Sequence, residues 1–72
     1  MKLIEILQNK KAEGYRYVTT NADRDLDILD IMSDADEDTR DYEIDGNSIR
    51  LVVDGYMVMG EPAYILSKQA QD

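Results

Sequence analysis

Apolar positions recur at helical spacing near the start of the chain and alternate with polar positions in its second half. Over residues 2–13, Leu3, Ile4 and Leu7 lie on one helical stripe, and two lysines fall in the last turns, where the helix dipole favours cations. Gly14 follows at the place where a left-handed glycine commonly ends a helix. The pattern therefore predicts a short amphipathic helix over residues 2–13.

Other segments alternate between two faces, as β-strands do. Residues 15–20 are rich in tyrosine, valine and threonine, which predicts a strand after the helix. Glycine-containing turns divide the C-terminal half into further predicted strands at residues 41–45, 49–53, 56–58 and 63–67. One face of this sheet is expected to form the core under the helix, and its residues are Tyr42, Ile44, Ile49, Leu51, Val53, Tyr56 and Val58.

The turns also predict the register of the strands. An Asp-Gly pair separates Val53 from Tyr56, which is the strongest hairpin signal in the chain, and a two-residue turn there makes these residues cross-strand partners. A Gly-Asn pair at residues 46–47, turned in the same way, places Glu43 opposite Arg50, a favourable pair of charges.

Residues 21–33 fit two interpretations. As a helix, the segment has Thr20 as its cap and an apolar face made of Ile28, Ile31, Met32 and Ala35. As a strand, Leu26 and Ile28 alternate with aspartates. Aspartate is unfavourable in both structures, so propensity does not decide between them. The interpretation favoured here is a strand over residues 26–32, followed by an acidic loop over residues 33–40.

Together these elements predict an α+β fold, with an N-terminal helix packed on a small antiparallel sheet, a meander of three to five strands. A chain of 72 residues has room for one core, so residues 1–72 are interpreted as a single domain. Its ordered part is expected to span residues 1–67, with a frayed tail over residues 68–72.

Charge changes the picture, because it is concentrated in the middle of the chain. The window from residue 23 to residue 45 holds eleven carboxylates against Arg24 and Arg40, a net charge of −9, whereas the whole chain carries −8. Such a surface attracts cationic partners and repels nucleic acid and anionic membranes. The carboxylates are Asp23, Asp25, Asp27, Asp30, Asp34, Asp36, Glu37, Asp38, Asp41, Glu43 and Asp45.

The sequence is compatible with three roles for this acidic window: a solvated surface, a cation-binding site, or an imitation of a polyanion. Asp34, Asp36 and Asp38 alternate as in a calcium-binding loop, but Thr39 stands where that loop needs glycine. Mimicry has a geometric basis, because alternate strand residues lie about 6.6–6.8 Å apart and every second phosphate of a DNA strand is about 6.8 Å further along the duplex axis.

A second candidate surface contains methionine. Met57 and Met59 are expected on the sheet face opposite the core, where either another segment covers them or they form an adaptable apolar contact surface.

Catalysis and cofactors have little support. The chain contains neither histidine nor cysteine, so the commonest general base and the strongest nucleophile are missing. No glycine pattern matches a phosphate-binding loop. No apolar run approaches the roughly 20 residues of a membrane span, and Glu5 interrupts the apolar N-terminal residues, so no secretory signal is expected. We therefore expect no enzyme, no cofactor, no metal site and a cytoplasmic location.

Small size, a strongly acidic surface and a helix with an antiparallel sheet resemble phage-encoded inhibitors that mimic DNA, among them several anti-CRISPR proteins and the uracil-DNA glycosylase inhibitors. Residues 1–67 are similar to the latter in the order of their elements. In that family an acidic-serine-apolar motif after the first strand enters the DNA groove of the enzyme, whereas the stretch Thr19 to Asp23 here has a different sequence. The resemblance implies an inhibitor in a host cytoplasm.

The sequence hypothesis is thus an acidic inhibitor that binds the basic groove of a nucleic-acid-binding protein and does not itself bind nucleic acid or membrane. The eleven carboxylates would supply the charge, and Met57 and Met59 part of the apolar contact. The alternative is a protein–protein interaction module or accessory subunit that pairs through its Met/Tyr sheet face. A homodimer is compatible with either.

Overall fold

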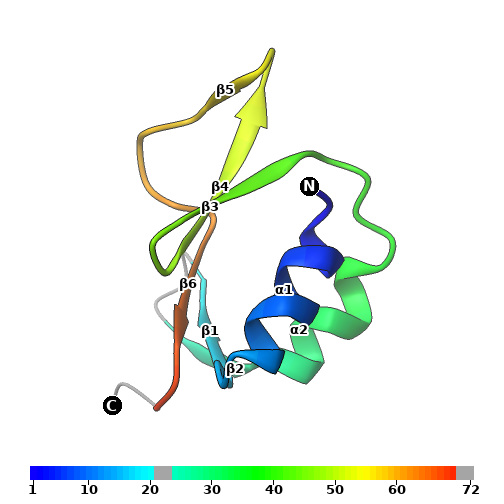
Figure 1. Ribbon diagram of the computed structural model, residues 1–72, viewed down its shortest axis with the longest axis vertical. Coiled ribbons are helices and arrows are strands. Elements are labelled where there is room, and N and C mark those ends of the chain that lie inside the picture. The colour runs from blue at the N-terminus through cyan, green and yellow to red at the C-terminus, as the bar shows by residue number, and fades with distance from the viewer. Residues whose placement is uncertain (21–23, 70–72) are drawn as a thin grey trace.

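The computed structural model describes residues 1–20 and 24–69, and it shows two helices on one side of an antiparallel sheet (Figure 1). In chain order the elements are α1 (Leu3–Ala12), β1 (Tyr17–Thr19), β2 (Asp25–Asp27), α2 (Ile28–Ala35), β3 (Tyr42–Asp45), β4 (Ser48–Val53), β5 (Tyr56–Met57) and β6 (Tyr64–Ser67). The predicted α+β fold, with its N-terminal helix on a small antiparallel sheet, is confirmed, and a second helix is added to it.

The first helix follows the prediction closely. Leu3 and Leu7 are buried on its inner face, and two lysines lie in its last turn. Gly14 has a φ of 102°, a left-handed conformation that glycine adopts without a steric penalty. The chain can therefore turn sharply into β1.

The strand favoured for residues 26–32 is wrong, because β2 ends at Asp27 and α2 begins at the next residue. The Leu29 amide donates to Asp27 Oδ1 at 2.9 Å, so Asp27 caps the helix. The apolar face of the alternative interpretation is the one that forms, with Ile28 and Ala35 buried. The predicted acidic loop is also shorter than expected, since α2 continues to Ala35.

The strands are ordered β2-β1-β6-β4-β3 in the sheet, and β5 pairs with β4 beside this path. Strands β3, β4 and β5 form the predicted meander, and both predicted registers are confirmed: Glu43 lies opposite Arg50, and Val53 lies opposite Tyr56. Strand β6 pairs with the beginning of β4, whereas β5 pairs with its end. The β4–β5 hairpin therefore projects beyond the level of the two helices (Figure 1).

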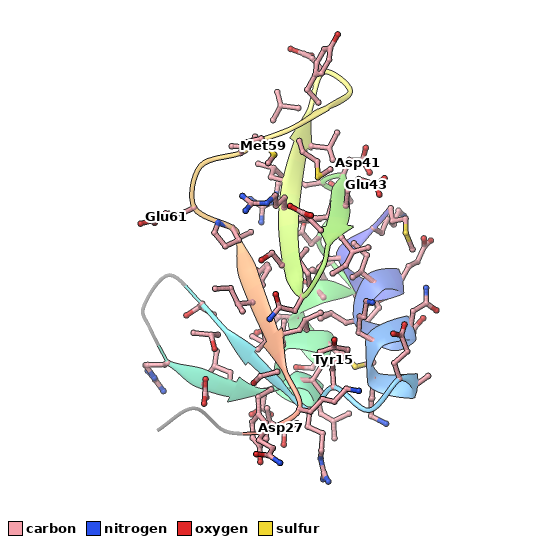
Figure 2. All side chains as sticks on the ribbon, turned by 60° about the vertical axis from the view of Figure 1, so that its left-hand side comes forward. Tyr15, Asp27, Asp41, Glu43, Met59 and Glu61 are labelled. Carbon is pink, nitrogen blue, oxygen red and sulfur yellow. The ribbon has the colours of Figure 1, made fainter. Side chains whose placement is uncertain are left out.

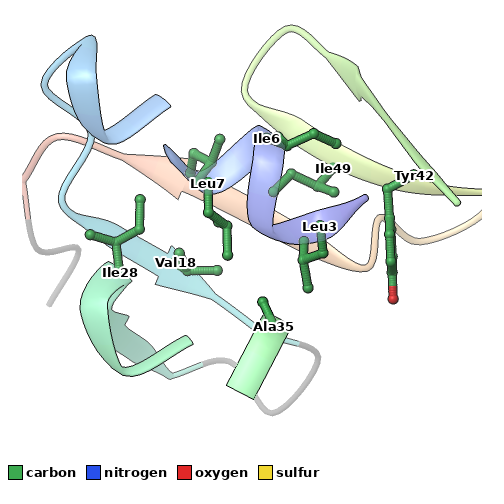
Figure 3. Packing of buried hydrophobic residues seen from close by; sticks show 9 residues of the cluster. Leu3, Ile6, Leu7, Val18, Ile28, Ala35, Tyr42 and Ile49 are labelled. Carbon is green, nitrogen blue, oxygen red and sulfur yellow. The ribbon is translucent and has the colours of Figure 1, made fainter. Parts of the chain in front are cut away.

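The core lies between the helices and the sheet (Figure 3). All the elements except β2 and β5 contribute to its buried residues, which are Leu3, Ile6, Leu7, Val18, Ile28, Ala35, Tyr42, Ile49 and Leu66. Burial of these apolar side chains supplies the main stabilising contribution.

Only part of the predicted core face is buried. Tyr42 and Ile49 are fully covered, and Ile44 and Leu51 partly. In contrast, Val53, Tyr56 and Val58 are 50, 79 and 43% exposed. The prediction that they face the core is wrong, because the hairpin extends past the helices that would have covered it (Figure 1).

Candidate functional site

Helix α2 presents a row of carboxylates to solvent. Two exposed acids of the helix and the two acids that directly follow it form a set that we call the α2 acidic surface: Asp30, Asp34, Asp36 and Glu37. Within residues 1–20 and 24–69, none of these four side chains has a hydrogen-bond or ion-pair partner. Four negative charges therefore remain uncompensated on one region of the molecule.

The surface is ordered by the backbone of the helix. Asp30 and Asp34 are four residues apart, so their side chains lie on the same helical face. The turn continues past the helix end, where the Glu37 amide donates to the Asp34 carbonyl oxygen at 3.3 Å. Glu37 is thus held on the same side, three residues after Asp34.

The charge distribution at the end of α2 opposes the helix dipole. Asp34 lies in the last turn and Asp36 is the C-cap residue, while the last turn contains no basic residue. The C-terminal end of a helix carries a partial negative charge, which disfavours carboxylates there by about 0.3–1 kcal/mol each. These acids consequently reduce the stability of the helix that presents them.

Asp38 belongs to a different environment from its acidic neighbours. Its carboxylate accepts hydrogen bonds from Arg40 Nη2 at 2.9 Å and from the Tyr42 hydroxyl at 2.8 Å. The guanidinium of Arg40 holds the pKa of Asp38 well below its usual range, and the Tyr42 hydroxyl acts in the same direction. Burial of the Tyr42 ring, followed by its bond to Asp38, raises the pKa of that hydroxyl. Asp38 therefore connects the α2 acidic surface to the core and is not a free charge.

The acids of β3 are also partly compensated. Asp41 Oδ1 accepts a hydrogen bond from the amino group of Met1 at 2.6 Å. The same amino group lies 3.7 Å from Glu43 Oε1. The hydrogen bond with Asp41 raises the pKa of this amino group. Arg50 Nε lies 3.3 Å from Asp45 Oδ2. The acids of this strand, whose spacing was expected to imitate phosphates, therefore lie beside cations that compensate part of their charge.

The acids before α2 have structural partners. Asp25 accepts a hydrogen bond from the Thr19 hydroxyl at 2.8 Å across the β1–β2 pair. Asp27 caps α2, as described above. Asp23 lies outside the described residues. The sequence pattern identified these residues as acidic but contained no signal for their partners.

The structure does not assemble a cation site from the described residues. Asp34 is helical, which removes the loop that a calcium-binding pattern requires, and no group of three or more acidic side chains converges within residues 1–20 and 24–69.

The second predicted surface lies on the projecting hairpin. Five large apolar side chains are exposed on it, a set that we call the hairpin surface: Val53, Tyr56, Met57, Val58 and Met59. Met57 is 40% and Met59 66% exposed, so no described segment covers them, although the sequence had left such a cover open. Figure 2 shows Met59 at the same end of the molecule as Asp41 and Glu43.

A hydrogen-bonded arginine supports this hairpin, in addition to its predicted pairing across the strands with Glu43. Arg50 Nη1 donates to the Gly60 carbonyl oxygen at 2.7 Å, and its side chain is only 14% exposed. The turn itself places Asp54 and Gly55 at φ values of 53° and 84°, as a two-residue turn with two left-handed positions requires. The hairpin is therefore fixed at its tip and along its return segment.

Comparisons with family models, with curated proteins and with solved structures give no match to this chain. Neither helix in the described part of the chain has the length and apolar character needed to cross a bilayer. The two exposed surfaces are the features of the described residues that bear on function.

Proposed function

We propose that this chain is a non-enzymatic inhibitor that occupies the basic nucleic-acid-binding groove of an enzyme or nucleoprotein, in the place of nucleic acid. The observation that carries the proposal is the α2 acidic surface, with four exposed carboxylates that have no partner in the described residues. The class is that of the DNA-mimic inhibitors, and its place of action is the cytoplasm of a host cell.

The geometry of α2 supports this use. Residues four apart on a helix are separated by about 6 Å along its axis, and every second phosphate of one DNA strand is separated by about 6.8 Å. Asp30 and Asp34 have this helical separation. A cationic groove that tracks phosphates therefore meets carboxylates at a similar interval.

The cost of these charges to the fold also supports a role in binding. Solubility is served by acids at any exposed position, and it gives no reason to place Asp34, Asp36 and Glu37 at the helix end that disfavours them. Binding sites commonly retain groups that reduce stability, because the gain comes when the partner is bound.

The test is a capture experiment with two matched triple variants. The chain is immobilised and exposed to a bacterial lysate, and bound proteins are identified after elution with duplex DNA or with NaCl. The first variant, Asp34→Asn with Asp36→Asn and Glu37→Gln, removes three charges from the α2 acidic surface. The second, Glu5→Gln with Asp54→Asn and Glu61→Gln, removes three charges from exposed positions elsewhere.

The proposal expects captured nucleic-acid-binding proteins that duplex DNA displaces and that rising salt releases, because such contacts are ionic. It expects the first variant to lose them and the second to retain them. Equal loss in both variants would show that only net charge matters and would contradict the proposal. Asp38 is left unchanged because its carboxylate is bound to Arg40 and Tyr42.

A second candidate function rests on the hairpin surface. Its exposed apolar side chains, with two methionines, suit a protein–protein interaction module or accessory subunit that docks through this hairpin. Tyr56→Ser with Met59→Gln would abolish capture by this route, and the captured partner would be retained at high salt. The triple variant of the α2 acidic surface would leave it unchanged, which separates the two candidates.

A further inference from the structure

We infer that a cavity at the end of the molecule opposite the hairpin binds a small organic anion, namely a carboxylate or phosphate carried on a flat apolar group. The cavity has a volume of about 310 Å³ and lies where the end of α1, the segment that leads into β1 and the beginning of α2 meet. Figure 2 places Tyr15 and Asp27, which both line it, at the opposite end from Met59. The cavity shares no residue with either surface considered above, although its Leu29 directly precedes Asp30 of the α2 acidic surface.

Two cations of the cavity wall are available for an anion. Lys11 and Arg16 line it, and neither has an ion-pair partner within residues 1–20 and 24–69, although the chain contains 16 acids. Elsewhere, Arg40 and Arg50 are bonded to aspartates. The planar guanidinium of Arg16 suits carboxylate and phosphate groups, which it can bind with two parallel hydrogen bonds.

The backbone fixes the position of Arg16. Its amide donates to the Ser67 carbonyl oxygen at 3.0 Å, and its own carbonyl oxygen accepts from the Ile28 amide at 2.9 Å. Arg16 is therefore tied to β6 on one side and to α2 on the other. Because the backbone is already fixed, binding of an anion requires no ordering of the main chain at this residue.

One acid also lines the cavity. Asp27 accepts a hydrogen bond from the Leu29 amide, so one of its oxygens is engaged at the helix cap. The two cations outweigh this single charge. Lys68 lies nearby, 5.1 Å from the centre of the Tyr15 ring, whereas Lys10, 5.7 Å from the same ring, is paired with Glu13 at 3.4 Å. The anionic group is consequently expected on the Lys11 and Arg16 side of the cavity.

The remaining wall and the volume define the rest of the ligand. Tyr15 and the exposed Leu29 supply the apolar part of the wall, since Ile28, which also lines the cavity, is only 2% exposed. The volume lies at the lower limit of the range of about 300–1,000 Å³ that is usual for small-molecule sites. A ligand with a single ring and one anionic group fits both properties.

Titration of the ¹⁵N-labelled full chain tests this inference by NMR. The ligands are phenyl phosphate and benzoate, with benzyl alcohol and inorganic phosphate as controls, each raised to about 10 mM so that dissociation constants on the order of 1 mM are measurable. We expect saturable shifts of the Gly14, Arg16 and Leu29 amides with at least one aromatic anion. The stronger of the two anions identifies carboxylate or phosphate as the preferred group.

Matched variants complete the test. Arg16→Ala and Lys11→Ala should each weaken the binding about tenfold, as loss of a charge-assisted hydrogen bond does. Arg24→Ala and Lys2→Ala, which remove the same charges from exposed positions elsewhere, should leave it unchanged. The spectra of the variants also report whether each remains folded. Shifts that do not saturate, equal binding of benzyl alcohol or inorganic phosphate, or equal effects of the control variants would each overturn the inference.

Discussion

The Arg40 guanidinium donates two hydrogen bonds to the Asp38 carboxylate, at 2.9 and 3.1 Å, and the same guanidinium lies 5.5 Å from the centre of the Tyr42 ring. Tyr42 is buried in the core. The Asp38–Arg40 pair, which belongs to the segment between α2 and β3, therefore contacts a core residue. One carboxylate of the acidic window therefore has a stabilising role that its neighbours do not share.

This difference predicts opposite outcomes for two aspartates that are two residues apart. Asp38→Ala should reduce the free energy of unfolding by about 1–3 kcal/mol, because it removes charge-assisted hydrogen bonds and leaves the Tyr42 hydroxyl without its acceptor. Asp36→Ala should change it by less than about 0.5 kcal/mol or increase it slightly, since Asp36 is exposed at a helix C-terminus. Urea unfolding followed by circular dichroism measures both. Equal losses in the two variants would refute the structural assignment of Asp38.

The same carboxylate predicts a dependence of stability on pH. The pKa of Asp38 is lower in the folded chain than in the unfolded chain, chiefly because of its hydrogen bonds from Arg40. A group of this kind stabilises the fold fully above its unfolded pKa of about 3.9, and the contribution is lost as pH falls below that value. The difference in unfolding free energy between wild type and Asp38→Ala should therefore be constant from pH 7 to pH 5 and should shrink towards pH 3. A difference that stays constant down to pH 3 would contradict the prediction.

The two ends of α2 predict opposite effects of the same substitution. Asp27→Ala should reduce the free energy of unfolding by about 0.5–2 kcal/mol, because it removes the hydrogen bond to the Leu29 amide at the N-terminus. Asp34→Ala should increase it by about 0.3–1 kcal/mol, because it removes a negative charge from the last turn and introduces the best helix former. Thermal unfolding of the two variants at low salt compares them directly. A stabilising Asp27→Ala, or a destabilising Asp34→Ala, would show that α2 does not end where the structure places its ends.

The local features of the sequence were the predictable ones. A two-residue turn fixes the pairing of the residues beside it, so the registers of Val53 with Tyr56 and of Glu43 with Arg50 followed from the turns alone. The helix over Leu3–Ala12 followed from its stripe and from Gly14. The strand favoured over residues 26–32 was wrong because the deciding group, the Asp27 cap of α2, is one aspartate among many and no local pattern distinguishes it.

The long-range features were not predictable from the same patterns. Nothing in the local alternation of residues places β1 between β2 and β6, or β6 beside the start of β4. The ion pairs of Asp38 and Asp45 depend on where their arginines lie in the fold. The sequence therefore identified the acidic window as a whole. Among the residues that the structure describes, the four carboxylates without a partner are distinct from those with structural partners.

The hairpin surface depends on Arg50, which joins two parts of the chain. Its guanidinium bonds to the Gly60 carbonyl oxygen at 2.7 Å and lies 3.3 Å from Asp45, so it holds the return segment after β5 against β4. Arg50→Met keeps much of the apolar stem and removes these bonds. We expect the backbone order parameters of Met59 and Gly60 to fall from about 0.85 to about 0.6, measured by ¹⁵N relaxation.

Leu66, whose amide donates to the Asn47 carbonyl oxygen at 2.7 Å, should keep its order parameter in the Arg50→Met variant. Arg24→Met, the matched change at an exposed arginine, should alter none of the three. Unchanged order at Met59 and Gly60 in Arg50→Met would mean that the turn alone fixes the hairpin and that Arg50 is not its support.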